Sequence, residues 1–395
     1  MFRKDFAVIS QRRMKSIIIL LWVLTSLPAT AIRTPRSRLV ASGDSGQTFS
    51  ENGAWKRLAE YTAMAPILPN SANSRRFLQY ATGLLANMSW TVEQQSWQHN
   101  VPAVNLTNLI AVKRGANAQS SIIILGAHYD ARLQADEDPD LLKRALPVPG
   151  INDGGSGVAV ILELARVLDI PPSYEVWLAL FDAEDQGNIP GWSGDLEGSC
   201  IGSTYFVNHL NDSLRNRVLF TIIIDLVGSS SLRLTKEGYS NKQVALRIWE
   251  TAKNLGFSDT FIDLTEGAII DDHLPFLKAG IAAVDIIQLR DNEGYTFFKW
   301  HHTTNDTLAN VSPRSLYRVG RTLEVFLESL ASEPSPFDTE QQRLTILMEA
   351  LLLGGIAASI LALLVLAKKQ VHKSSHESCA QSMCAIIITH DPYYF

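Results

Sequence analysis

The chain contains few cysteines and no dense cluster of basic residues. Its 395 residues include three cysteines, and Cys200 is the only one between residues 32 and 340. A disulfide within that segment is therefore excluded, and its stability must come from a packed core. The formal net charge is -5, and lysine and arginine form no stripe in the middle of the chain. Without such a basic patch we expect no nucleic-acid partner.

The chain also lacks internal repeats, long low-complexity tracts and the serine elbow of many hydrolases. Gly155-Ser156-Gly157 falls short of the G-x-S-x-G pattern that exposes a nucleophilic serine. Apolar residues are plentiful: hydrophobic residues make up 46% of the chain, and charged residues make up 19%. This composition can build a sizeable core, either in two domains or in one large one.

The N-terminal part has the pattern of a secretory signal. Basic residues precede an apolar run over residues 17–27, and Ala29-Thr30-Ala31 offers the small residues of a cleavage site. We therefore predict a signal peptide over residues 1–31. The polar stretch that follows, residues 32–52, has no periodicity and is predicted to be a linker.

The C-terminal part has the pattern of a membrane anchor. Residues 350–367 carry no charge, and apolar residues extend the run upstream to Leu344. This predicts a transmembrane helix over residues 344–367, preceded by a linker over 334–343. Lysines at the start of residues 368–395 predict a cytoplasmic tail. The segment between signal and anchor would then face outward along the secretory pathway, tethered to the membrane.

Between these ends, predicted strands alternate with predicted helices. Continuous apolar runs such as residues 122–125 and 176–180 indicate strands covered on both faces, and residues 156–168 indicate an amphipathic helix. Such alternation is typical of an α/β fold with a mostly parallel, mixed central sheet flanked by helices. We predict a single domain over residues 53–333. The long acidic and proline-rich loop over residues 130–150 is expected to border its site.

Polar residues gather at one edge of the predicted sheet. In an open α/β sheet ligands bind at the carboxyl ends of the strands, where residues far apart in sequence converge. The side chains expected there are carboxylates and imidazoles: His128, Asp153, Glu184, Asp185, Asp225, Asp271, Asp272, His273, His301 and His302. Oxygen and nitrogen ligands without cysteine suit a catalytic zinc ion, whereas calcium or magnesium would take more oxygens.

The adjacent acids Glu184 and Asp185, which follow a predicted buried strand, are the most informative pair. Neighbouring carboxylates at the end of such a strand repel each other and lose solvation, so a cation or a division of roles must keep both there. Asp185 would bind zinc while Glu184 stays free to move protons.

Each acid at this edge also has a simpler explanation. Glu184 and Asp185 would instead cap a helix N-terminus, and Asp153 would do the same for the helix that follows it. Asp225 would be a turn residue, and His128 a buried histidine with ordinary hydrogen bonds.

Six ordered motifs resemble metallopeptidase family 28, which joins zinc aminopeptidases with the animal-type glutaminyl cyclases. Within about residues 55–330 they are GAHYD, INDGGSG, FDAEDQG, DLVG, DDHLPFL and HHTTNDT. The resemblance implies a single zinc-exopeptidase-like α/β domain, in agreement with the alternation of strands and helices. It also implies that Asp153, Asp185 and one histidine bind zinc, and that Glu184 is the general base.

The histidine ligand and the number of zinc ions stay open at this point. Aligning on the tail that begins at Thr303 selects His302, whereas aligning on the family's Trp-His pair selects His301, because Trp300 precedes it. In an aminopeptidase the resemblance implies a second zinc ion on His128 and Asp225, about 3.5 to 4 Å from the first. In a cyclase it implies one zinc ion.

Several details resemble the bacterial glutaminyl-peptide cyclotransferases, which cyclise an N-terminal glutamine to pyroglutamate and release ammonia. They include the Glu-Asp pair, the DDH triplet, and Trp192 and Trp300, which would line the substrate pocket. Asp225 and Asp271 would hydrogen-bond with each other or with Glu184 and assist the reaction. A zinc aminopeptidase acting on peptide or protein N-termini would use the same residues. The third hypothesis is that the chain is an inactive, peptide-binding membrane ectodomain.

Overall fold

The computed structural model describes residues 48–116, 119–169 and 173–330. The predicted signal peptide, the 334–343 linker, the transmembrane helix and the cytoplasmic tail lie outside these residues and stay predictions. Among the helices that are described, none combines the length and apolar character needed to cross a membrane.

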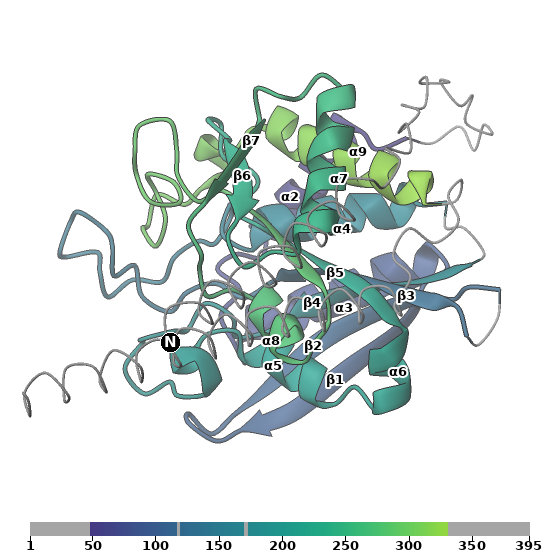
Figure 1. Cartoon of the computed structure of the whole chain (residues 1–395). Coiled ribbons are helices and arrows are strands. Elements are labelled where there is room, and N and C mark those ends of the chain that lie inside the picture. Colours follow the sequence, from purple (N-terminus) through teal and green to yellow (C-terminus); the bar gives the residue numbers. More distant parts are fainter. Residues whose placement is uncertain (1–47, 117–118, 170–172, 331–395) are drawn as a thin grey trace, which may run out of the picture. The chain divides into compact units, whose positions relative to one another are not determined.

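A six-stranded mixed sheet occupies the centre of the described domain (Figure 1). In chain order the elements are α2 (Glu51–Thr62), α3 (Ala72–Asn87), β1 (Thr91–His99), β2 (Val104–Lys113), β3 (Ser121–His128), α4 (Gly155–Val167), β4 (Tyr174–Phe181), η1 (Asp195–Gly198), α5 (Ile201–Asn208), α6 (Asp212–Arg217), β5 (Val218–Asp225), β6 (Leu234–Glu237), α7 (Lys242–Asn254), β7 (Phe261–Glu266), α8 (His273–Lys278), β8 (Ala283–Ile287), η2 (Leu308–Asn310) and α9 (Pro313–Ser329).

The strand order of this sheet is β1-β2-β4-β3-β5-β8. Strands β4, β3, β5 and β8 run parallel to one another, whereas β2 is antiparallel to both β1 and β4. Strands β6 and β7 form a separate, parallel pair. The predicted α/β domain with a mostly parallel, mixed sheet is therefore confirmed.

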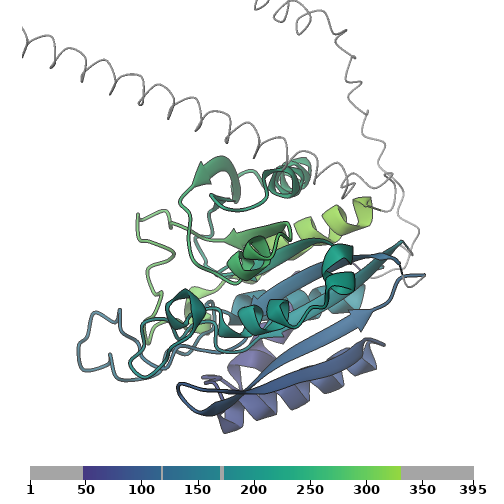
Figure 2. The ribbon, with the colours of Figure 1, turned by 60° about the horizontal axis from the view of Figure 1, so that its bottom comes forward.

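Helices cover both faces of the sheet (Figure 2). Helices α2, α3, α4, α7 and α9 belong to one side, and α5, α6 and α8 to the other. Successive side chains of a strand point to opposite faces, so Ile123 and Leu125 join the first core and Ile122 and Ile124 the second. Strand β3 is thus covered on both faces, as its continuous apolar run predicted.

Helix α4 is buried on nearly every side, which its predicted amphipathic pattern did not indicate. All its residues except Arg166 are buried, because α2 and α9 cover the side that faces away from the sheet. A Cβ atom at Gly157 would lie 1.9 Å from the backbone oxygen of Ile224 on β5. Only glycine permits this approach of the helix to the sheet.

The folded domain begins earlier than predicted. Helix α2 starts at Glu51, where Ser50 Oγ accepts a hydrogen bond from Gly53 N at 2.9 Å. Phe49 is already buried, so the predicted linker over residues 32–52 extends too far. Strands β6 and β7 and helix α6 were not predicted, because they are short and their residues form no long apolar run.

Candidate functional site

The carboxyl ends of three parallel strands bring the predicted site residues together. His128 ends β3, Asp225 ends β5, and Glu184 and Asp185 follow β4. At this edge Glu137, His301 and His302 form one group of potential ligand atoms within 4.8 Å of one another. Two adjoining ligand groups contain the aspartates: His128, Asp153 and Asp225, and Asp153, Asp185 and His302. Asp153 belongs to both, as a residue shared between two metal ions would.

His302 faces the aspartate pair more closely than His301 does. His302 Nε2 lies 3.0 Å from Asp185 Oδ1 and 3.7 Å from Asp153 Oδ2. His301 Nε2 lies 3.9 Å from that oxygen of Asp153, while its Nδ1 contacts Glu137 Oε2 at 3.1 Å. The two rings stack with centroids 3.6 Å apart. Burial and the charge of His301 lower the pKa of His302 to about 3, which favours the neutral imidazole that metals bind.

The chemistry of Asp153, Asp185 and His302 fits a zinc ion. Asp153 Oδ2 and Asp185 Oδ2 are buried and have no hydrogen-bond partner among the described residues. Burial raises the pKa of Asp153, and it raises the pKa of Asp185 to about 7. Buried carboxylates of this kind are retained where a cation compensates them. Two carboxylates and a neutral imidazole are a donor set that zinc accepts, with a position left for substrate.

His128 connects the shared Asp153 to Asp225. Its Nε2 lies 3.2 Å from Oδ1 of each aspartate, and its Nδ1 lies 3.1 Å from the backbone oxygen of Asp130. Asp225 Oδ1 also accepts hydrogen bonds from Gly154 N at 3.1 Å and Leu226 N at 2.8 Å. Burial would raise the pKa of Asp225, but the charge of His128 and these hydrogen bonds together lower it. Of the two aspartates that contact His128, Asp225 is therefore the one whose anionic form is favoured, because the pKa of Asp153 is raised.

Glu184 lies beside the ligand groups and belongs to neither. Its Oε1 accepts a hydrogen bond from Cys200 Sγ at 3.3 Å. Burial raises its pKa well above the usual range, with further increases from the charges of Asp271 and Asp272 and an opposing effect from His128. A carboxyl group with a raised pKa is suited to accept and return a proton near neutral pH.

The capping explanation for these acids does not hold in the described structure. The chain continues from Asp185 as a loop, and the next α-helix, α5, begins only at Ile201. Asp153 does not cap α4 either, because the capping residue there is Gly154 and no side chain bonds to the first turn. Neither carboxylate is therefore used as a helix cap, and Asp185 Oδ1 instead lies 3.4 Å from Nη1 of the buried Arg132 while its Oδ2 has no partner among the described residues.

Asp271 is buried just before α8 and interacts with the site through its charge. Burial, with the charges of Asp225 and Asp272, raises its pKa well above the usual range. The described residues show no hydrogen bond between Asp271 and either Asp225 or Glu184, contrary to our expectation. The reason is that the Asp271 carboxylate turns to its own loop and accepts a hydrogen bond from Asp272 N.

The two predicted pocket tryptophans lie in separate apolar clusters. Trp192 packs with Leu106 and Ile201 and stacks on His99 with centroids 5.9 Å apart. Trp300 belongs to another cluster, and the Lys299 ammonium lies 5.2 Å from its ring centroid. Their predicted role in a substrate pocket stays a prediction.

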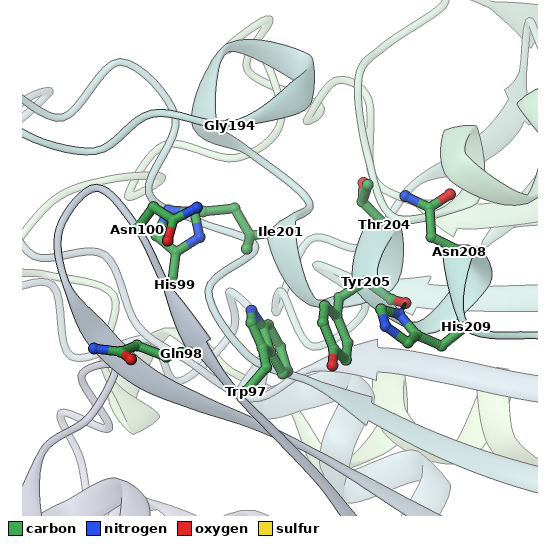
Figure 3. Close-up of a pocket in the computed structure, with 10 residues that line it drawn as sticks. All are labelled: Trp97, Gln98, His99, Asn100, Gly194, Ile201, Thr204, Tyr205, Asn208 and His209. Atoms are coloured by element: carbon green, nitrogen blue, oxygen red, sulfur yellow. Dashed lines mark hydrogen bonds between the residues drawn. The ribbon is translucent and has the colours of Figure 1, made fainter.

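A pocket of about 290 Å³ lies between the β1–β2 hairpin and α5 (Figure 3). Trp97 stacks on Tyr205 with centroids 4.1 Å apart, and Tyr205 stacks on His209 at 3.8 Å. Its lining includes none of the predicted metal ligands, catalytic residues or pocket tryptophans. The pocket is therefore separate from the candidate site.

Two aspartates without a predicted role hold the backbone of the site. Asp130 Oδ1 accepts a hydrogen bond from Glu184 N at 2.9 Å, and its Oδ2 accepts one from Asp185 N at 3.3 Å. Asp306 Oδ2 accepts one from Asp153 N at 3.1 Å, and its Oδ1 accepts one from the preceding residue. Asp130 lies in the GAHYD motif and Asp306 in the HHTTNDT motif. These motifs were the sequence signal from which a role for the two aspartates could have been predicted.

With this geometry established, comparison with known proteins decides the family. A sequence model of peptidase family M28 matches residues 108–327, more than half of the chain. The chain belongs to peptidase family M28. Aminopeptidase YwaD of Bacillus subtilis is 29% identical over 249 residues, which are 60% of this chain and 47% of that protein. The chain spans about half, or less, of the length of the first curated relatives that it matches.

Solved structures of this fold carry names from both branches of the family. Glutaminyl cyclase of Bacteroides thetaiotaomicron is 30% identical, with a TM-score of 0.65 over 73% of this chain and 99% of that chain. A Zn-dependent exopeptidase from Parabacteroides distasonis is 27% identical, with a TM-score of 0.65 over 71% of this chain and 98% of that chain. The M28 chain described here therefore has the zinc-exopeptidase-like fold that the motifs implied.

Proposed function

We propose that this M28 chain is a zinc-dependent glutaminyl-peptide cyclotransferase. The observation that carries the proposal is the different placement of the two neighbouring acids. Asp185 lies in a ligand group with Asp153 and His302, whereas Glu184 lies beside that group with a raised pKa. Both reactions would use this arrangement, and similar solved structures include proteins named glutaminyl cyclase and leucine aminopeptidase precursor. Cyclisation is preferred because the Glu-Asp pair and the DDH triplet resemble the bacterial glutaminyl-peptide cyclotransferases.

Asp153, Asp185 and His302 would hold the zinc ion. When bound, zinc acts as a Lewis acid that polarises the side-chain amide carbonyl of an N-terminal glutamine. Asp130 would keep the ligand Asp185 and the base Glu184 in fixed positions through their backbone N–H groups. Preorganisation of this kind reduces the entropy that the reaction itself must lose.

Glu184 would carry the proton of the reaction. It accepts a proton from the substrate's α-amine as that nitrogen forms a bond to the side-chain carbonyl carbon, and it delivers the proton to the departing amide nitrogen. The bond between the carbonyl carbon and the amide nitrogen breaks, and ammonia leaves. No water is consumed, so the peptide keeps all its residues.

A zinc aminopeptidase is the second candidate, because a second ligand group adjoins the first. His128, Asp153 and Asp225 could hold a further zinc ion, with Asp153 between the two ions. Glu184 would then take its proton from water and protonate the new amine. The predicted signal peptide and membrane anchor would, for either reaction, place the site outside the membrane with peptide or protein N-termini as substrates.

The products distinguish these two reactions. The purified full chain, loaded with zinc, is incubated with a glutaminyl peptide and separately with a leucyl amide. We expect ammonia release from the glutaminyl peptide, with a mass loss equal to ammonia and no free amino acid. Release of free glutamine or leucine would overturn the cyclase in favour of the aminopeptidase. No change in either substrate would support the inactive reading.

A further inference from the structure

A further group of carboxylates and imidazole lies outside the two ligand groups described above. Asp271 precedes α8, His273 is the first residue of α8, and Asp285 lies in β8. Their potential ligand atoms lie within 4.8 Å of one another. His273 and Asp285 are 0% exposed, and the proposed reaction uses neither. We call these three residues the α8 cluster.

Two members of the α8 cluster, His273 and Asp285, have polar atoms without hydrogen-bond partners among the described residues, whereas Asp271 accepts a hydrogen bond from Asp272 N. Both ring nitrogens of His273 and both carboxylate oxygens of Asp285 form no hydrogen bond within the described structure. A buried donor or acceptor without a partner costs about 1–3 kcal/mol, and a charged group costs more. The carboxylates of Asp271 and Asp285 and the imidazole of His273 are thus a buried set of donor atoms suited to a positively charged ligand.

The distance between His273 and Asp285 fits two ligands of one metal ion. His273 Nδ1 lies 3.4 Å from Asp285 Oδ2. With metal–ligand bonds of about 2.1 Å, two ligand atoms of a tetrahedral zinc ion lie about 3.4 Å apart. The nitrogen and the oxygen do not bond to each other, so both have lone pairs available for an ion.

Glu237 lies on the other side of the imidazole and is fixed in place. Its Oε2 is 3.3 Å from His273 Nε2. The Glu237 carboxylate accepts hydrogen bonds from Ser240 N at 2.8 Å, Ser240 Oγ at 3.0 Å and Tyr239 N at 2.9 Å. A histidine that binds a metal usually directs its second nitrogen to such a carboxylate, which sets the tautomer. Glu237 would keep a proton on Nε2 and leave Nδ1 free for the metal.

We propose that Asp271, His273 and Asp285 form a further metal site, which takes a divalent cation of the zinc class. One imidazole nitrogen and two carboxylates suit zinc, whereas calcium and magnesium would take more oxygen ligands. The ion would neutralise the buried carboxylates and hold the start of α8 against β8. The site shares no residue with the two ligand groups at the sheet edge and does not depend on which reaction the enzyme catalyses.

Metal counting on the purified full chain tests this site. After dialysis against zinc and then against metal-free buffer, we expect Asp285→Asn to hold one ion per chain fewer than the wild type. His302→Ala should lose a different ion, and the double variant should lose both, because the two sites share no ligand. Asp291→Asn is the matched control: this buried aspartate accepts hydrogen bonds from Glu293 N and Tyr295 N, outside the α8 cluster. Its metal content should equal that of the wild type.

A folded Asp285→Asn variant with the wild-type metal content would overturn the proposal; folding is judged from its circular dichroism spectrum. If that variant does not fold, a crystal structure of the zinc-loaded wild type tests the proposal instead. Anomalous diffraction at the zinc edge should show a peak between His273 Nδ1 and Asp285. A peak at Asp153, Asp185 and His302 without one at His273 would overturn the proposal equally.

Discussion

The α4 face of the sheet and its carboxyl edge are built in opposite ways. The face is a continuous apolar core, in which burial stabilises the fold by about 25 cal/mol per Å². The edge buries the carboxylates of Asp153 and Asp185, each of which has one oxygen without a hydrogen-bond partner among the described residues, and such burial costs free energy. Apolar burial at the α4 face thus offsets the free energy that is lost by burying carboxylates at the carboxyl edge. Substitutions at the edge should change chemistry and metal binding, whereas substitutions at the face should change folding.

Glu184→Gln should have the largest effect and tests the edge. The amide cannot accept the proton, so we expect turnover of the glutaminyl peptide to fall by about 10²- to 10⁴-fold. Zinc content should not change, because Glu184 lies outside both ligand groups. The thermal midpoint should not fall, because glutamine has the same shape and its amide oxygen can still accept the hydrogen bond from Cys200 Sγ. Turnover, zinc content and thermal unfolding are measured on the same preparation. Lost zinc would show that Glu184 is a ligand, and unchanged turnover would refute its role as base.

His302→Ala and His301→Ala form a matched pair for the ligand group. His302 Nε2 lies 3.0 Å from Asp185 Oδ1, whereas the contact that His301 Nε2 makes with a ligand carboxylate is 3.9 Å, to Asp153 Oδ2. We expect His302→Ala to lose its zinc ion and His301→Ala to keep it, with affinity lower by at most about 10- to 100-fold. Zinc titration of the metal-free variants gives both affinities. Equal losses would mean that the two stacked imidazoles share the ligand role.

The sequence predicted those features that depend on local pattern. Apolar runs end where strands end, so the positions of His128 and Asp225 at strand ends followed from the sequence. The rule that parallel strands share a carboxyl edge predicted that Asp153 and Asp185 lie at the same edge, and the motif resemblance implied that both bind zinc. The motif resemblance then connected these residues to one family, and its fold is confirmed.

The remaining features depend on tertiary packing. Which of the two histidines faces Asp185 depends on the loop backbone at His302, where φ is 51°. The full burial of α4 depends on α2 and α9, which lie far from it in sequence. The roles of Asp130 and Asp306 depend on loops that meet only in the folded chain. A local sequence pattern does not predict such contacts between segments that are far apart in the chain.

Gly157→Ala tests the face. The added Cβ would meet the Ile224 backbone oxygen at 1.9 Å, so α4 must move away from β5. Overpacking of this kind costs about 1–3 kcal/mol, and we expect the free energy of unfolding to fall by at least that much. Urea unfolding measures the change, and zinc affinity of the folded fraction should stay within a few-fold of the wild type. Gly83→Ala is the control, because a Cβ on this α3 glycine meets no atom within 4 Å.

Ser50→Ala should have the smallest effect and tests the outer border of the face. Ser50 Oγ caps α2 through Gly53 N at 2.9 Å and also donates to the buried Glu163 on α4 at 3.1 Å. Loss of an N-cap costs about 1 kcal/mol. Ser71→Ala removes the corresponding cap of α3, where Ser71 Oγ accepts from Ser74 N at 3.0 Å, and serves as the control. A larger loss for Ser50→Ala, measured by urea unfolding, gives the contribution of the Glu163 contact. Turnover per folded molecule should be unchanged in both variants, and a fall in either would mean that the face and the edge are not separable.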